Sequence, residues 1–118
     1  SGIAVLNAAD ATVLDMAKLC DGDVILYAID GQHPALIAHR AEGRRTVFIH
    51  DDIVVQDDGH HRFELIVKKD LPDVVRAMPD DVLLAAVGAG LALAMEADTI
   101  ATGLKTFEPL LSGQKQTA

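Results

Sequence analysis

Residues Ile3 to Ile29, IAVLNAADATVLDMAKLCDGDVILYAI, decide the fold because a strand pattern, a helix pattern and a second strand pattern follow one another. Ile3–Leu6 is a short apolar run, and Asp10 after it suits a helix N-cap, because its carboxylate can accept backbone N–H groups. Val24–Ile29 is apolar at consecutive positions, as in a parallel strand that is covered on both faces. The stretch therefore predicts a right-handed strand–helix–strand unit with two parallel strands.

The helix between these strands is expected to have one apolar face. Val13, Met16, Ala17 and Cys20 recur at helical spacing. Gly22 follows and suits a left-handed residue just past the end of a helix. The sequence thus predicts that this face packs on the sheet and that Gly22 ends the helix.

The middle of the chain changes from a helix to a strand pattern. Pro34 suits the first position of a short helix that runs to Glu42 and ends at Gly43. Arg45 to Lys68 then contains three apolar stretches separated by turn residues at Asp51-Asp52 and Asp57-Asp58-Gly59, and the Asp-Gly pair supplies the positive φ of a tight hairpin. These residues predict a three-stranded antiparallel meander.

The side chains of the last strand of the meander are expected to alternate between the core and the solvent-exposed face of the sheet. The residues expected to face the core are Phe63, Leu65 and Val67. Those expected to face water are Arg62, Glu64 and Lys68. For Leu71 to Met78 two interpretations stay open, a single helical turn starting at Pro72-Asp73 or a loop.

Two helices are expected near the carboxyl end. Asp80 to about Glu96 is apolar all round in its middle, which predicts a buried helix, and Gly88 and Gly90 within it are tolerable if another backbone packs closely there. Asp98 is expected to cap a short amphipathic helix, Thr99 to Phe107, that puts Ile100, Leu104 and Phe107 on one side. Glu108-Pro109 is expected to end this helix.

Together these elements predict an α/β fold. It consists of a partial parallel sheet (βαβ), a small antiparallel β-meander and two C-terminal helices. The 118 residues are enough for one domain with its own core, 1–118, in which we expect 112–118 to be a flexible tail.

Composition excludes several classes of partner. The chain has 10 Lys and Arg against 18 Asp and Glu, a formal charge of -8, which argues against nucleic-acid and anionic membrane surfaces. No apolar run reaches the roughly 18–20 residues of a transmembrane helix. The one cysteine, Cys20, excludes an intrachain disulfide and fits a reducing compartment. We therefore expect a cytoplasmic protein with no nucleic-acid and no membrane partner.

Asn7 and Asp10 are the candidate binding residues. They lie where a parallel strand gives way to a helix, and ligands of open α/β sheets bind beyond the carboxyl ends of the strands. Two interpretations remain open. Asn7 makes the turn and Asp10 only caps the helix, or both face a nucleotide.

The other chemistry-bearing residues do not form a catalytic or metal-binding set. His60 and His61 stand beside two aspartates, but adjacent strand residues point to opposite faces, so a solvated hairpin tip is expected. His33 and His39 have no serine, cysteine or carboxylate residue at a sequence spacing that is typical of a catalytic site. Cys20 is at a helix C-terminus, where the dipole opposes a thiolate. We expect no catalytic residue and no metal ligand.

Four short stretches, in this order, resemble a known family. They are IAVLNAAD at 3–10, CDGDVI at 20–25, AAVGAGLAL at 85–93 and ATGLKTF at 101–107. Together they resemble the second half of the ATP-binding central domain of the Mur ligase superfamily, above all that of cyanophycin synthetases. The resemblance runs from about Ile3 to Phe107.

This resemblance implies an ATP-dependent ligase ancestry. Such enzymes use ATP and magnesium to activate a carboxylate as an acyl phosphate and then form an amide. Asn7 and Asp10 are the family's nucleotide-contacting positions that this chain keeps. The family's phosphate loop and metal ligands lie upstream of the matched region, and Ala9, Ala11 and Val82 depart from its pattern. We therefore expect no cofactor to be held by this chain alone.

Two functions follow as expectations. The first is a fragment or truncated relative of a Mur-type ATP-dependent carboxylate–amine ligase that is inactive alone. The second is a stand-alone α/β binding or assembly module without catalysis, in which an exposed sheet edge is covered by homo-oligomer formation.

Overall fold

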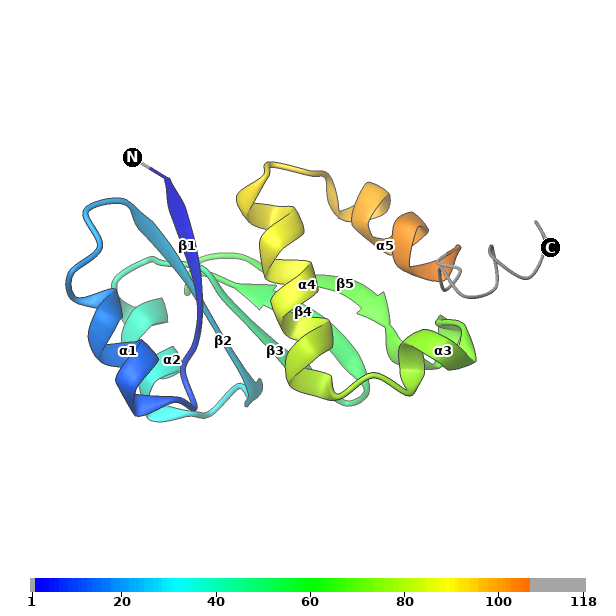
Figure 1. Cartoon of the computed structure of the whole chain (residues 1–118), viewed down its shortest axis with the longest axis horizontal. Coiled ribbons are helices and arrows are strands. Elements are labelled where there is room, and N and C mark those ends of the chain that lie inside the picture. The colour runs from blue at the N-terminus through cyan, green and yellow to red at the C-terminus, as the bar shows by residue number, and fades with distance from the viewer. Residues whose placement is uncertain (1, 107–118) are drawn as a thin grey trace, which may run out of the picture.

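The protein is described here by a computed structural model of residues 2–106, apart from the side chain of Ala97; Figure 1 shows one mixed sheet with helices on both faces. The strands are β1 (Ile3–Asn7), β2 (Asp23–Asp30), β3 (Thr46–His50), β4 (Ile53–Asp57) and β5 (Arg62–Val67). The helices are α1 (Ala11–Ala17), α2 (Pro34–Ala41), the 3₁₀ turn η1 (Lys68–Asp70), α3 (Asp73–Arg76), α4 (Asp80–Ala92) and α5 (Ala97–Lys105). The predictions for Phe107, Glu108-Pro109 and the tail 112–118 lie outside the described residues.

The five strands follow one another across the sheet in chain order, β1-β2-β3-β4-β5. β1 pairs parallel with β2, with Val5 opposite Ile25, and β2 pairs parallel with β3. β3, β4 and β5 are antiparallel to one another. The predicted α/β class, the parallel βαβ unit and the meander are confirmed. The first strand of the meander is also the third parallel strand, so the two parts form one continuous sheet.

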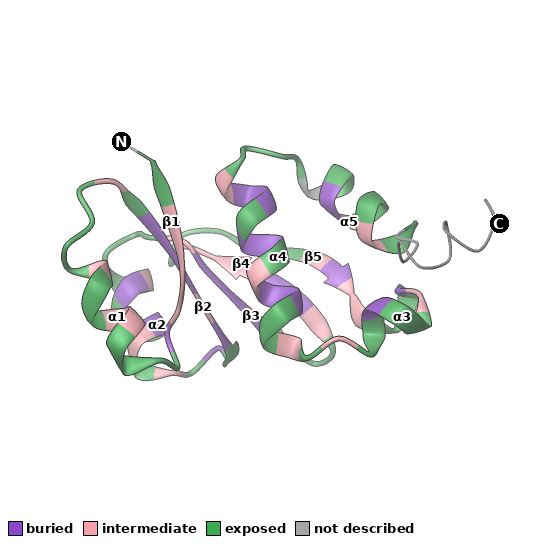
Figure 2. Ribbon diagram, in the orientation of Figure 1, coloured by how far each residue is buried: buried purple, intermediate pink, exposed green. Residues whose placement is uncertain are grey.

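Two apolar cores lie on opposite faces of this sheet. Figure 2 shows buried segments, in purple, on α2, on α4 and on the strands of the sheet. Consecutive residues of β2 supply both, because Ile25 joins the core under α4 while Val24 and Leu26 join the core under α1 and α2. α4 packs on β1, β2 and β3, and α5 packs on β5. The run of apolar residues in β2 is thus explained by helices on both sides.

The start of α1 is as predicted, but its apolar face is not. Asp10 caps the helix, whereas the residues that pack on the core are Leu14 and Ala17. Met16 is 54% exposed and Cys20 is exposed as well. The predicted stripe therefore does not pack on the sheet as a whole.

Gly22 does not adopt the left-handed conformation that was predicted, because α1 already ends at Ala17. Its need for glycine has another cause. A Cβ at Gly22 would lie 2.1 Å from the carbonyl oxygen of Gly2, so the loop before β2 passes tightly against the start of β1.

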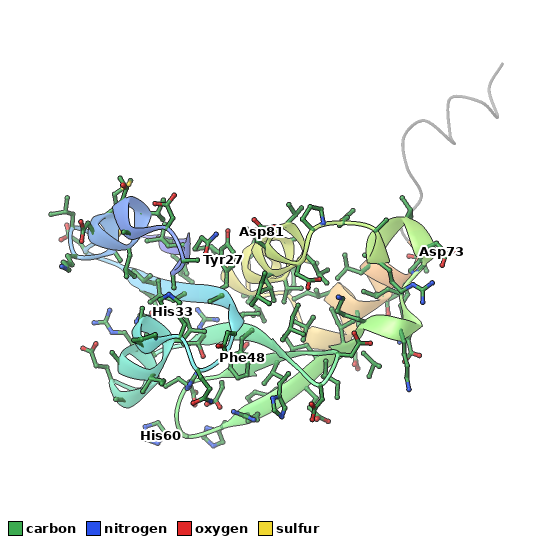
Figure 3. The ribbon with its side chains drawn as sticks, turned by 90° about the horizontal axis from the view of Figure 1, so that it is seen from below. Tyr27, His33, Phe48, His60, Asp73 and Asp81 are labelled. Atoms are coloured by element: carbon green, nitrogen blue, oxygen red, sulfur yellow. The ribbon has the colours of Figure 1, made fainter. Side chains whose placement is uncertain are left out.

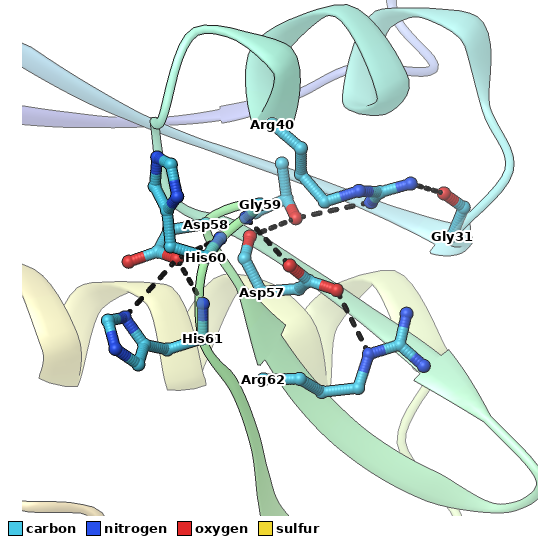
Figure 4. A network of polar contacts seen from close by, with 9 residues as sticks. Gly31, Arg40, Asp57, Asp58, Gly59, His60, His61 and Arg62 are labelled. Atoms are coloured by element: carbon cyan, nitrogen blue, oxygen red, sulfur yellow. Dashed lines mark hydrogen bonds and ion pairs between the residues drawn. The ribbon is translucent and has the colours of Figure 1, made fainter.

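Both hairpin turns use positive φ angles. Asp51 and Asp52 have φ of 50° and 64°, the pattern of a two-residue type I′ turn between β3 and β4. Gly59, between β4 and β5, has a φ of 89°, and a Cβ there would lie 2.3 Å from the Arg40 carbonyl oxygen. Figure 4 shows this second turn lying against the end of α2.

A bulge in β5 overturns the predicted alternation. Val54 pairs with Ile66 but Val55 pairs with Glu64, so Leu65 is an extra residue in the ladder. Ile66 rather than Val67 is buried, and Phe63 is 51% exposed. A regular period of two cannot foresee an inserted residue.

The helical end of the chain differs from the prediction mainly at its boundaries. The open segment from Leu71 to Met78 contains the short helix α3. α4 ends at Ala92, four residues early, and α5 begins at Ala97 with Glu96 at its N-cap, so Asp98 lies in the first turn instead of capping. Ile100 is buried as expected. Among residues 2–106, no helix is both long and apolar enough to cross a bilayer.

The end of α4 is a Schellman motif with alanine at the left-handed position. Ala94 has a φ of 59°, and its N–H donates to the Leu91 carbonyl at 3.0 Å. The N–H of Met95 donates to the Gly90 carbonyl, also at 3.0 Å. These two bonds satisfy carbonyl groups that the helix leaves free and turn the chain toward α5.

Gly88 and Gly90 of α4 are in close contact with other elements, as expected, but the groups that approach them are side chains and not backbone. A Cβ at Gly88 would lie 2.6 Å from Cγ1 of Val5 in β1. A Cβ at Gly90 would lie 2.9 Å from Cδ1 of Ile100 in α5. Gly88 thus lets α4 lie directly on β1.

Candidate functional site

A pocket of about 290 Å³ lies at the carboxyl ends of β1 and β2. This is the edge of a parallel sheet at which ligands usually bind. Its polar lining residues are Asn7, Tyr27, Asp30, His33 and Asp81. Figure 3 shows Tyr27, His33 and Asp81 around this end of the molecule, on β2, at the start of α2 and at the start of α4. We call this the carboxyl-edge pocket.

Of the two residues predicted from the sequence, only Asn7 lines the pocket. Its Oδ1 accepts the Ala9 N–H at 2.9 Å, which leaves the side-chain NH₂ group as a donor. Asp10 is not among the lining residues. Its Oδ1 accepts the N–H groups of Thr12 at 3.0 Å and Val13 at 3.2 Å, as a helix N-cap does. The turn and the cap are therefore both formed.

Tyr27 contributes a hydroxyl group that stays protonated. Burial raises the pKa of Tyr27 above its usual value, and the nearby negative charge of Asp81 raises it further. The phenol is therefore a hydrogen-bond donor at neutral pH.

His33 and Asp30 add one donor and one acceptor. His33 is the N-cap of α2, and its Nδ1 accepts the Ala35 N–H at 3.1 Å. Because that nitrogen accepts, the ring proton of the neutral form is on Nε2, which can donate. Asp30 Oδ1 accepts the Gln32 N–H at 2.8 Å, which leaves its second oxygen for a ligand.

The electrostatics of the pocket favour uncharged polar groups over phosphates. The N-termini of α2 and α4 supply partial positive charge, but Asp80 and Asp81 occupy the first turn of α4. Asp80 is paired with Lys68 at 2.7 Å. None of the described residues that line the pocket is a lysine or arginine. Hydroxyl groups can bind to the carboxylates, whereas a triphosphate would meet like charge.

The histidine pair of the second hairpin does not converge on a common point. Asp58 Oδ1 accepts the backbone N–H groups of His60 at 2.9 Å and His61 at 2.7 Å, and these bonds hold the pKa of the Asp58 carboxyl below its usual range. Figure 4 shows the two imidazole rings on different sides of that carboxylate. Both histidines precede β5, so they are turn residues and not strand residues. Among residues 2–106, no three metal-ligating side chains are grouped for an ion.

Sequence reasoning missed four of the five polar lining residues. Asp30 and His33 follow β2 just as Asn7 ends β1, so the rule that selected Asn7 could have selected them too. Tyr27 was hidden within an apolar strand pattern. Asp81 reaches the pocket only because α4 packs across β1 and β2, which no local pattern predicts.

The arrangement offers hydrogen-bond donors and acceptors to a small ligand. The polar lining supplies amide, phenol and imidazole donors next to two carboxylates, and its described residues include no serine, cysteine or lysine nucleophile. A small molecule with hydroxyl groups and a polar ring matches such a set. Comparison of the chain with models of known protein families and with curated proteins finds no match.

Proposed function

We propose that this chain is the nucleoside-binding half of an ATP-dependent ligase core of the Mur type, and that it is catalytically inactive alone. The observation that carries the proposal is the carboxyl-edge pocket, because it combines donors suited to a purine with carboxylates suited to ribose hydroxyls. The resemblance of four ordered stretches to that superfamily supports the same assignment. ATP and the single thiol both favour a cytosolic location.

Inactivity follows from the charge of the pocket. No described lining residue is a lysine or arginine that could hold phosphate groups, and Asp30 and Asp81 repel them. Amide ligation by an acyl phosphate needs the γ-phosphate and its magnesium ion to be held in line with the carboxylate. ATP hydrolysis by this chain alone is therefore expected to be indistinguishable from that in buffer.

The test is an NMR titration of the chain with adenosine and, separately, with ATP and magnesium. Adenosine is expected to shift the amide signals around Asn7, Tyr27 and His33 with millimolar affinity, and ATP is expected to bind no more tightly. Tyr27→Phe should weaken binding about three- to ten-fold, since one donor is lost. His60→Ala, outside the pocket, is the matched control and should change nothing.

Two results would contradict the proposal in different ways. If adenosine leaves the pocket signals unchanged, the nucleoside assignment is wrong. If ATP with magnesium binds at micromolar concentration or is hydrolysed, the nucleoside assignment survives but the inactivity does not.

The open edge of β1 favours a second function, assembly without catalysis. Among the described residues β1 pairs on one side only, and its first residue, Ile3, is 39% exposed. Met16 and Leu19, in and just after α1, are 54% and 83% exposed. Edge strands without a charge, proline or bulge are templates for pairing with another chain. Homodimers formed edge to edge would be detected by sedimentation velocity across a range of concentrations, and Ile3→Lys, at an exposed position of β1, should abolish them. A monomer at all concentrations rules this function out.

A further inference from the structure

A second pocket, of about 310 Å³, separates α1 from α2 on the other side of the sheet from α4. It shares no lining residue with the carboxyl-edge pocket. Its floor is apolar and comes from Leu14 of α1 and from Val24 and Leu26 of β2. We call it the α1–α2 groove. Its volume is at the lower end of the range of roughly 300–1,000 Å³ that is usual for small-molecule sites.

The groove exists because alanines stand where larger side chains would fill it. Ala17 of α1 and Ala35 and Ala38 of α2 form its walls. A core that had to be filled at this place would carry leucine or isoleucine, as buried positions of β2 do. The floor and walls together accept an apolar body.

The rim of the groove is cationic, although the chain as a whole is strongly acidic. Lys18 and Arg44 lie at the rim, with Glu42 as the one acidic lining residue. Arg44 makes no ion pair within the described part of the chain, and Lys18 has only an exposed pair with Asp15 at 3.5 Å. In a chain of formal charge -8, this local excess of positive charge favours an anionic head group.

His39 adds a polar group at the same place. The residue is 8% exposed, and its Nε2 donates to the Val24 carbonyl oxygen at 2.7 Å. No hydrogen bond of Nδ1 is formed within the described residues, and no buried side-chain nitrogen or oxygen among them lacks a partner, so Nδ1 is reached by solvent. His39 lines the groove and so presents a polar group beside the apolar floor.

From these observations we infer that the α1–α2 groove binds a small amphipathic carboxylate. The apolar tail lies on Leu14, Val24 and Leu26 between the alanine walls. The carboxylate is held at the rim by Arg44 and Lys18. The site is independent of the proposed nucleoside pocket, so either assignment can fail without the other.

The probe that tests this inference is octanoate, used below the concentration at which it forms micelles. In an NMR titration of the ¹⁵N-labelled chain it should shift the amide signals of Ala17, Ala35 and Ala38 in a saturable way. Octan-1-ol and octylammonium have the same tail with a neutral and a cationic head, and both should bind more weakly than octanoate.

Two variants separate the tail from the head group. Ala38→Leu fills the groove from an exposed helix position and should abolish the shifts. Arg44→Gln changes only an exposed side chain and should weaken octanoate about three- to ten-fold, while leaving octan-1-ol unchanged. Arg76→Gln, on α3 and outside the groove, is the matched control and should bind octanoate like the unmodified chain.

Three results would overturn the inference. They are equal affinity for octanoate and octan-1-ol, unchanged octanoate binding by Ala38→Leu, and saturable shifts located away from the groove. The Arg44→Gln comparison stands even if Ala38→Leu fails to fold.

Discussion

At the scale of single residues, His39 connects stability to pH. Its ring is buried against β2 and donates to the Val24 carbonyl. Burial lowers the pKa of His39 below its ordinary value of 6.5, and the positive charge of the nearby Arg44 lowers it further. The bond to Val24 and the negative charges of Glu42 and Asp23 raise this pKa, but by less. The folded state therefore prefers neutral imidazole. Its contribution to stability is complete above the pKa of the unfolded chain and is lost as the pH falls toward the lower pKa of the folded state.

We expect the free energy of unfolding to fall as the pH drops below the ordinary histidine pKa of 6.5, with a slope of at most about 1.4 kcal/mol per pH unit. His39→Gln can keep a donor for the Val24 carbonyl but does not titrate, so it should flatten the slope in this window. The measurement is urea unfolding at a series of pH values, with His60→Gln as control. If the pH dependence of the free energy of unfolding is the same in His39→Gln, other titrating groups and not His39 determine it.

Ala94 is a second residue with a measurable energetic consequence. It holds a φ of 59° at the end of α4, where an alanine is strained and a glycine is not. Ala94→Gly should therefore raise the free energy of unfolding by about 0.5–1 kcal/mol, the difference between relieved strain and the greater freedom of the unfolded chain. Ala89→Gly, at an exposed interior position of α4, is the control and should lower it by about 1 kcal/mol. Thermal unfolding of both variants distinguishes the two effects.

At the scale of elements, the contact of α4 with β1 depends on Gly88. A Cβ there would come within 2.6 Å of Val5 Cγ1, and a β-branched side chain has little freedom to move away. The Gly88→Ala substitution should destabilise the protein by about 1–3 kcal/mol despite the better helix propensity of alanine.

The matched control is Gly103→Ala in α5, because nothing lies within 4 Å of a Cβ at that position. This variant should gain about 1 kcal/mol from propensity alone. If the clash is the cause, Val5→Ala should largely rescue Gly88→Ala in a double-mutant cycle. Equal stabilisation by both glycine replacements would mean that α4 shifts at little cost.

At the scale of the whole molecule, charge repulsion opposes folding. The acidic residues exceed the basic ones by eight, and four of the seven ion pairs among the described residues have a partner whose side chain is more than half exposed. Raising the NaCl concentration from about 0.01 to 0.15 M at neutral pH should therefore stabilise the protein by about 0.5 kcal/mol, or about 2 °C in Tm. At a pH near the sequence pI of about 4.8 the same salt step should have little effect. A loss of stability at neutral pH would instead show that the ion pairs dominate.

Local patterns were sufficient to predict most of this fold, and long-range packing accounts for what they missed. Consecutive apolar residues in β2 and the cap at Asp10 gave the parallel unit, because both effects act within a few residues. The exposure of Met16 and the bulge at Leu65 depend on neighbours that are distant in sequence. The same holds for the candidate site. Asn7 was predicted from its place at the end of β1, whereas Asp81 reaches the pocket through long-range packing and was not predicted.

The sheet order has a consequence for how the chain is made. Every strand pairs with the strand that precedes it, so no strand must wait for a partner that is translated much later. Such neighbour-to-neighbour pairing keeps loop-closure entropy small and speeds folding. During synthesis the sheet can therefore form in chain order, because each new strand pairs with the preceding strand, which has already left the ribosome.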